Sequence, residues 1–238
     1  MARKAGRKSK GGAGRGRHVR VKTARGRKTS STRWLQRQLN DPYVREAQRL
    51  GYRSRVAFKL AELDDRFGFL EKGTRVIDLG AAPGGWSQVA AERLGDEGRV
   101  FALDIAPIEP LAGVEIFEGD FYDDRMLSEL DKVVGMNVDV VLSDMAASAT
   151  GHAKTDHLRI MALAEAAYDF AWPRLSDGGC FVAKVFQGGT ERELLERLKR
   201  DFAKVVHAKP DSSRKESAEM YLVATGFRGN VQKDDGER

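Results

Sequence analysis

The sequence predicts an α/β fold of the Rossmann-like, doubly wound kind, with a mostly parallel sheet and helices on both faces. Three observations support this fold class. Short apolar runs alternate with amphipathic helical segments between residues 54 and 227. A glycine-rich turn, "DLGAAPGG", follows the first apolar run. Acidic residues stand at the ends of several runs, which is typical of the ligand-binding edge of such a sheet.

Charge divides the chain into a basic arm and an acidic domain. Residues 1–40 contain 14 Lys or Arg and no Asp or Glu, whereas the remainder holds 27 basic and 35 acidic residues. We expect a disordered arm over 1–40, one globular domain over 41–227, and a polar tail over 228–238. Such an arm is suited to nucleic-acid phosphates, with contacts that weaken in salt. The alternative is a solvated tail that aids solubility.

Composition also indicates the compartment. No apolar run approaches the length of a membrane span, and the N-terminus lacks the apolar core of a secretion signal. The single cysteine, Cys180, stands among apolar residues and is predicted to be buried and inert. A reducing cytoplasm is the expected location.

The first helix of the domain is predicted within "SRVAFKLAELDDRFGFL", residues 54–70. Apolar residues recur there at helical spacing, and Ser54 is the expected N-cap. Lys59 borders the apolar stripe. By itself this position suits a lysine whose stem packs while its ammonium reaches water.

Seven strands and four further helices follow. The strands are expected at 74–80, 98–105, 114–120, 138–145, 179–186, 203–210 and 218–227, and the helices at 86–94, 124–134, 156–175 and 191–202. Pro173 is expected to disturb the third of these helices. Because no helix separates the last two strands, the final strand is predicted to be an antiparallel insertion at the sheet edge.

The glycine-rich turn from Gly80 to Gly85 is the expected ligand site. It lacks the Gly-Lys-Ser/Thr ending of a P-loop. Ala82 replaces the glycine that lets a pyrophosphate approach, and Pro83 has no amide hydrogen to donate. The turn therefore favours a ligand without phosphates.

Two strand-end carboxylates refine this prediction. Asp104 ends the second strand, where a carboxylate can accept hydrogen bonds from ribose hydroxyls. Asp120 ends the third strand and can accept from an adenine amino group. Ribose and adenine without phosphate point to S-adenosylmethionine as cofactor. Each aspartate alone is also a common turn residue.

The segments "LGAAPGGWSQ", "SDMA", "KVFQG" and "SRKESAEMYLVATG" together resemble the FtsJ/RrmJ-type ribosomal RNA 2′-O-ribose methyltransferases, over residues 41–227. The resemblance implies a class I S-adenosylmethionine-dependent methyltransferase fold and a monomer. Its substrate would be a uridine ribose in the A-loop of large-subunit (23S-type) ribosomal RNA, within the assembled 50S subunit. The implied catalytic residues are Lys59, Asp144, Lys184 and Glu219, and the implied cofactor contacts are Gly84, Trp86, Asp104, Asp120 and Asp144. The sequence departs from the family where Ala147 and Ser148 replace a common Pro-Asn pair.

Methyl transfer to a ribose requires that the 2′-hydroxyl lose or share its proton while oxygen, carbon and sulfur are in line. Lys184 interrupts the apolar run "FVAKVF" and is assigned as the proton acceptor. A lysine that accepts a proton must be neutral. A charged Lys184 would instead act with Lys59 to orient the hydroxyl and stabilise the developing alkoxide. The sequence is compatible with both roles.

Three other functions compete with this one. A non-catalytic RNA-binding assembly factor, a methyltransferase for another RNA and a nicotinamide-dependent oxidoreductase are the alternatives. No metal site is predicted, since His152 and His157 do not have ligand spacing. The candidate RNA-facing cations are Arg33, Arg37, Arg53, Arg55, Arg214 and Lys215.

Overall fold

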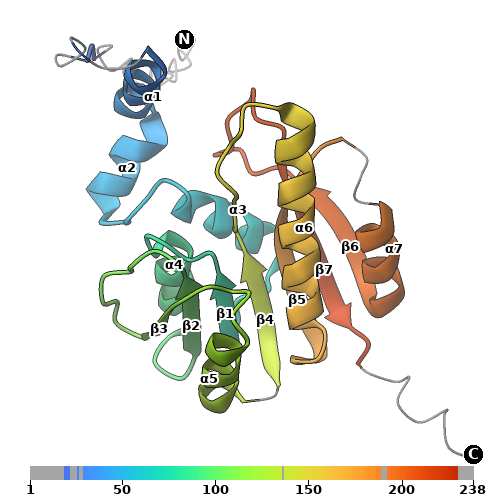
Figure 1. Ribbon diagram of the computed structural model, residues 1–238. Coiled ribbons are helices and arrows are strands. Elements are labelled where there is room, and N and C mark those ends of the chain that lie inside the picture. Colours follow the sequence, from blue (N-terminus) through green and yellow to red (C-terminus); the bar gives the residue numbers. More distant parts are fainter. Residues whose placement is uncertain (1–18, 22–25, 27–28, 136, 189–191, 230–238) are drawn as a thin grey trace, which may run out of the picture. The chain divides into compact units, whose positions relative to one another are not determined.

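A computed structural model of the chain describes residues 19–21, 26, 29–135, 137–188 and 192–229 (Figure 1). The chain divides into two compact units, residues 1–45 and 46–238. Most of the predicted basic arm, and the tail from residue 230 onward, lie outside the described residues.

The first unit contains a helix that the sequence analysis did not assign. Helix α1 spans Thr29–Asn40, within the arm expected to be disordered, and α2 spans Pro42–Leu50 across the boundary between the units. The side chains of Gln36 and Asn40 accept hydrogen bonds from the main chain of Val21 and Val19, at 3.1 and 2.8 Å. These contacts join residues that are 15 and 21 positions apart. Charge composition, which led to the expectation of disorder, carries no information about them.

The second unit contains the sheet. Its strands are β1 (Arg75–Leu79), β2 (Arg99–Asp104), β3 (Val114–Glu118), β4 (Val138–Ser143), β5 (Leu175–Phe186), β6 (Phe202–Ala208) and β7 (Glu219–Phe227). They follow the order β3-β2-β1-β4-β5-β7-β6. The first five pair in parallel, and β7 is antiparallel to both of its neighbours. The predicted seven-stranded, mostly parallel sheet is confirmed.

The position of the last strand differs in one respect from the prediction. Strand β7 is antiparallel, as expected, but it lies between β5 and β6, so β6 forms the edge. Val182, Val223 and Tyr221 are all buried in β5 and β7. The apolar β7 is covered by a neighbouring strand on each side when it lies inside the sheet. Strand β6 is shorter and more exposed, so it is better suited to the edge.

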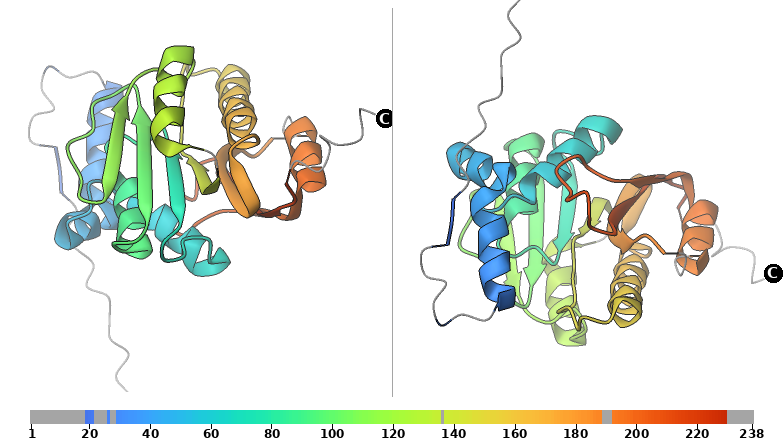
Figure 2. Two further views of the ribbon diagram at one scale, coloured as in Figure 1. Left: turned by 90° about the horizontal axis from the view of Figure 1, so that it is seen from below. Right: turned by 90° about the horizontal axis from the view of Figure 1, so that it is seen from above.

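Helices cover both faces of the sheet (Figure 2). One face packs against α5 (Asp124–Val134), α6 (Ala153–Ala171) and α7 (Arg192–Asp201). The other packs against α3 (Ala57–Phe67) and α4 (Gly85–Leu94). Successive strand residues point to opposite faces, so Ile77 lies in the first cluster and Val76 in the second. This alternation decides which side chains can face α3.

Helix boundaries confirm some of the predicted signals and correct one. Helix α3 begins at Ala57, and Ser54 is not its N-cap, because the chain turns into the helix only after Val56. Helix α6 is disturbed at Pro173 as expected, but it ends at Ala171 rather than at residue 175, and Leu175 already begins β5. Cys180 is buried as predicted, and burial, reinforced by the charge of Asp64, raises the pKa of its thiol. Among the described residues no helix is long and apolar enough to cross a membrane.

Candidate active site

Three of the four predicted catalytic residues are brought together by strand direction. Asp144 follows the last residue of β4, and Lys184 lies near the end of the parallel strand β5. Glu219 begins β7. Because β7 is antiparallel, its first residue lies at the same edge as the last residues of the parallel strands. The pleat also places Asp144, Lys184 and Glu219 on the face covered by α3.

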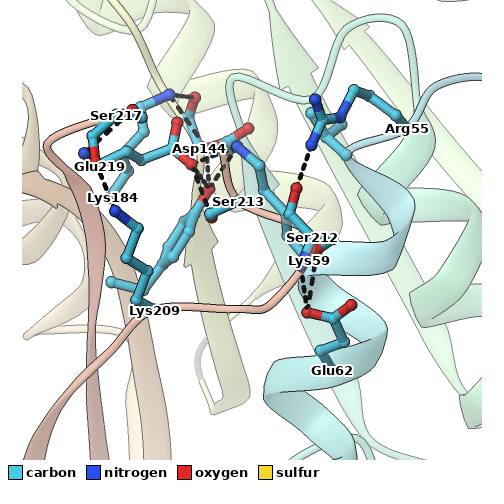
Figure 3. A network of polar contacts seen from close by, with 12 residues as sticks. Arg55, Lys59, Glu62, Asp144, Lys184, Lys209, Ser212, Ser213, Ser217 and Glu219 are labelled. Atoms are coloured by element: carbon cyan, nitrogen blue, oxygen red, sulfur yellow. Dashed lines mark hydrogen bonds and ion pairs between the residues drawn. The ribbon is translucent and has the colours of Figure 1, made fainter. Parts of the chain in front are cut away.

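The fourth residue comes from that helix. Lys59 of α3 forms an ion pair with Glu219, and Lys184 forms a second one with Asp144 (Figure 3). Lys184 Nζ donates to the main-chain oxygen of Asp144 at 2.6 Å and to its Oδ1 at 3.1 Å. Both lysines are buried, each with 7% of its surface exposed. The lysine predicted from helical spacing to snorkel therefore points into a polar cluster instead.

Tyr221, which is not among the residues predicted from the sequence, links the two ion pairs. Its hydroxyl lies 2.9 Å from Asp144 Oδ1, 3.3 Å from Glu219 Oε1 and 3.3 Å from the ammonium of Lys59. It pairs directly with Lys184 in the β5–β7 ladder. A local signal existed, since Tyr221 stands two residues after Glu219 and must share its face. Only the strand order, however, places Asp144 within its reach.

The charges of the cluster depend on one another. Burial alone would raise the pKa of Glu219, but the charge and hydrogen bond of Lys59, with help from Lys184 and Ser213, hold that pKa below its ordinary value. Burial and the carboxylates of Asp144 and Glu219 raise the pKa of Tyr221 well above its usual value. At neutral pH Glu219 is therefore an anion and Tyr221 a neutral hydrogen-bonding group.

A cavity of about 610 Å³ adjoins this cluster at the carboxyl ends of β1, β2, β3 and β4. Asp104, Asp120 and Asp144 all line it, which is the convergence expected from their strand-end positions. Asp104 also accepts hydrogen bonds from the main-chain nitrogens of Ala82 and Ala106, each at 2.8 Å. Asp120 accepts from Tyr122 N at 3.0 Å. Ile105 and Phe121 add apolar lining.

The other two predicted cofactor contacts do not line this cavity. Gly84 adopts φ +102°, a left-handed conformation suited to glycine, at the start of α4. The ring of Trp86 is buried, its indole nitrogen donates to Val56 O at 2.9 Å, and it packs against Tyr221. The Trp86 side chain is thus committed to the core. Only its main chain, in the first turn of α4, remains for a cofactor.

The glycine-rich turn is closely packed against the loop that carries Asp144. A Cβ at Gly80 would come within 2.8 Å of Met145 Cα. This residue also has φ +75°, so both the backbone conformation and the space require glycine. The turn is therefore held against the Asp144 loop by backbone contact. Ala147, three residues after Asp144, lines the cavity, and it is one of the two residues that replace the Pro-Asn pair common in the similar family.

Asp78, beneath the turn, was not singled out from the sequence. It is fully buried in β1, and Ser87 Oγ donates to its Oδ2 at 2.6 Å. Burial raises the pKa of Asp78 to about 7, against the opposing hydrogen bond from Ser87, and the charges of Asp144 and Asp104 add to the rise. The signal for it in the sequence was a lone acid in the apolar run "VIDL".

Two of the candidate RNA-facing arginines bind the protein's own backbone. Arg53 donates to the carbonyl oxygens of Pro83, Glu109 and Pro110, at 3.2, 2.7 and 2.7 Å. It therefore joins the glycine-rich turn to the β2–β3 loop. Arg55 donates to the carbonyl oxygen of Ser212. Sequence alone gives an arginine a charge but does not identify the acceptors around it.

For the other four candidate RNA-facing residues, contact with RNA stays a prediction. Arg37 and Lys215 are exposed and Arg214 is half-buried, whereas the Arg33 side chain lies outside the described part of the structure. Within the described residues, no group of three or more His, Cys, Asp or Glu side chains is arranged to hold a metal ion.

A doubly wound sheet with an antiparallel β7, and a cavity at its carboxyl edge beside a lysine-rich polar cluster, define a methyltransferase of the Rossmann-like class. Comparison with known proteins specifies the family. The model of the FtsJ-like methyltransferase family matches residues 52–227. The chain belongs to this family.

Individual relatives agree with this assignment. The ribosomal RNA large subunit methyltransferase E of Granulibacter bethesdensis is 57% identical over 220 residues, covering 92% of this chain and 95% of that protein. The protein of the same name from Paramagnetospirillum magneticum is 58% identical over 226 residues, covering 93% of each. The crystal structure of a candidate ribosomal RNA methyltransferase from Plasmodium falciparum superposes with a TM-score of 0.68 at 31% identity, over 75% of this chain and all of that one.

Proposed function

We propose that this protein methylates the 2′-oxygen of a uridine ribose in large-subunit (23S-type) ribosomal RNA, with S-adenosylmethionine as the methyl donor. The observation that carries the proposal is the contact between Lys184 and Asp144 at the rim of a cavity suited to the donor. The high identity to proteins named ribosomal RNA large subunit methyltransferase E supports the choice of RNA. We further propose the A-loop of the assembled 50S subunit as the site, and the cytoplasm as the location.

The cavity residues fit an adenosyl group that carries no phosphate. Asp104 offers carboxylate oxygens to a ribose diol, and Asp120 can accept from the adenine amino group. The apolar side chains of Ile105 and Phe121 suit the faces of a purine. Bound there, the cofactor supplies an electrophilic methyl group on a sulfonium.

The polar cluster is suited to activate the ribose. Lys184 is held by Asp144 through two hydrogen bonds, and its remaining bonding position can serve the 2′-hydroxyl. We assign Lys184, once it is deprotonated, as the acceptor of the hydroxyl proton and Asp144 as the group that orients it. Lys59, held by Glu219, is assigned to the developing negative charge on the oxygen. A donor held by Asp104 and Asp120 would supply the methyl group and keep the electron pair of the C–S bond on its sulfur, while Lys184 takes the hydroxyl proton.

The basic arm is proposed to supply contacts to RNA phosphates. Its charge is the supporting observation, since residues 1–40 contain 14 cationic and no acidic side chains. Arg214 and Lys215 are proposed to contribute beside the active site. Binding to ribosomal subunits should then weaken steeply as salt rises.

The experiment uses 50S subunits from cells that lack this protein, incubated with the full chain and labelled S-adenosylmethionine. We expect label in a 2′-O-methyluridine of the A-loop. Label in another RNA would favour the alternative methyltransferase function. Binding to subunits with no transfer would favour a non-catalytic assembly factor.

A further inference from the structure

The loop between β6 and β7, residues 209–218, is fastened to α3 through one residue. Ser212 is fully buried, and its main-chain nitrogen and hydroxyl both donate to Glu62 Oε2 at 3.0 Å. Its carbonyl oxygen accepts from Arg55. Three polar groups of Ser212 are thus bound by two side chains from the α3 region (Figure 3). We call these contacts the Ser212 clamp.

The loop also binds itself and the cluster. Lys209 Nζ donates to the carbonyl oxygen of Ser217 at 2.6 Å, which closes the loop near its ends. Ser213, the residue after the clamp, donates its hydroxyl to Glu219 Oε1 at 3.3 Å. It is 6% exposed. The position of the Glu219 carboxylate therefore depends on a residue that the clamp holds in place.

Helix α3 provides the common support. Glu62 follows Lys59 by three residues, so the two side chains lie on neighbouring positions of one helix face. Lys59 pairs with Glu219, while Glu62 binds the loop that carries Ser213. A single rigid helix thus sets both sides of the Lys59–Glu219 pair. The cavity that we assign to the cofactor is lined by none of residues 209–218.

We propose that Glu62 is a positioning residue for methyl transfer, which acts through the Ser212 clamp on Ser213, Glu219 and the adjoining cations of the loop. The clamp serves the RNA side of the reaction and leaves cofactor binding unaffected. This inference rests on the proposed function. We assign Glu62 no proton transfer, and its Oε2 accepts both hydrogen bonds from Ser212.

The test compares Glu62→Ala with Glu62→Gln in the full chain, and Glu129→Ala, at an exposed glutamate of α5, is the matched control. An amide oxygen can still accept from both donors of Ser212, whereas alanine cannot. We expect Glu62→Ala to lower kcat/KM for 50S subunits by about tenfold or more, since it strips a charge-assisted pair of hydrogen bonds. Glu62→Gln should recover most of that loss. The Kd for S-adenosylmethionine should change by less than about twofold in all three variants.

Amide hydrogen exchange tests the Ser212 clamp even if a variant has no methyltransferase activity. Amide hydrogen exchange in residues 209–218 should be faster in Glu62→Ala than in the wild type and near wild type in Glu62→Gln. Unchanged exchange in Glu62→Ala would overturn the clamp. Faster exchange with unaltered kcat/KM would overturn its role in positioning. If the wild-type protein methylates no subunit, the proposed function fails, and exchange still decides whether the clamp exists.

Discussion

Lys184 Nζ lies 3.1 Å from Asp144 Oδ1, across two neighbouring parallel strands. The residues are 40 positions apart, and both are largely shielded from water, with side-chain exposures of 7% and 15%. A charge pair so placed interacts more strongly than one on the surface, and removing one partner leaves the other uncompensated.

Replacing Lys184 tests the assignment of the proton acceptor. Lys184→Ala should lower kcat by about a hundredfold to ten-thousandfold, the usual contribution of a positioned general base. The Kd for S-adenosylmethionine, measured by calorimetry, should stay within a few-fold of the wild-type value. Lys132→Ala, at an exposed lysine of α5, is the control. Unchanged turnover in Lys184→Ala would refute the catalytic role.

Replacing Tyr221 by phenylalanine tests the link between the two ion pairs. Tyr221→Phe keeps the ring that packs against Trp86 but removes the hydroxyl that contacts Asp144 and Lys59. We expect kcat to fall by about tenfold to a hundredfold, because hydrogen bonds to charged groups are among the stronger ones. The pH profile of kcat should also shift, since the cluster titrates as a unit. A variant with wild-type kcat and pH profile would show that the hydroxyl only fills space.

Replacing Lys59 tests the electrostatics of Glu219. The pKa of Glu219 is low because Lys59, together with Lys184 and Ser213, outweighs the effect of burial. In Lys59→Met burial should dominate and raise that pKa above its ordinary value. The wild-type pair contributes stability above the unfolded pKa of about 4.5 and loses it as pH falls through the lower folded pKa.

The test compares the free energy of unfolding in urea of the wild type and of Lys59→Met at pH 4, 5.5 and 7. The advantage of the wild type over Lys59→Met should be largest at pH 7 and shrink toward pH 4. Lys132→Met should show no such trend. An advantage independent of pH would mean that Lys59 contributes through packing alone.

Asp78 should make the stability of the protein depend on pH in the direction opposite to that of the Lys59–Glu219 pair. Its folded pKa of about 7 exceeds the unfolded value of 3.8, so the folded state binds more protons between these limits. The contribution of Asp78 to stability should therefore fall as pH rises from about 4 to about 7, by about 1.4 kcal/mol per pKa unit at most.

Asp78→Asn removes this titration. The stability of the variant relative to the wild type should increase from pH 5 to pH 8 in urea unfolding, whereas Asp96→Asn, at an exposed residue, should not change with pH. Parallel curves for Asp78→Asn and wild type would contradict the raised pKa.

Arg53 is predicted to act on cofactor affinity rather than on RNA. Arg53→Ala removes the donors that join Pro83 of the glycine-rich turn to the β2–β3 loop. We expect the Kd for S-adenosylmethionine to rise by about tenfold, since several hydrogen bonds from a charged group are lost. Subunit binding by filtration should be unchanged. The exposed Arg66 of α3 supplies the control variant. If Arg53→Ala instead bound subunits more weakly and kept normal cofactor affinity, Arg53 would be an RNA-binding residue and this prediction would be wrong.

The sequence by itself determined the strands of the sheet, the helices that pack against them, and the residue types of the site. Seven apolar runs became seven strands, and Asp104 and Asp120 lie in one cavity, because strand periodicity and strand-end position are local properties. The motifs identified Lys59, Asp144, Lys184 and Glu219 as a set, and the structure brings these four together.

Only the tertiary structure decided how these parts pair. It placed β7 between β5 and β6, and it placed the Tyr221 hydroxyl between two ion pairs. It also showed that Arg53 and Arg55 donate to backbone carbonyl oxygens. It also placed Glu62 against Ser212, 150 residues away. The physical reason is that hydrogen bonds and charges act over a few ångströms in space, and strand order and helix packing determine which distant residues come that close.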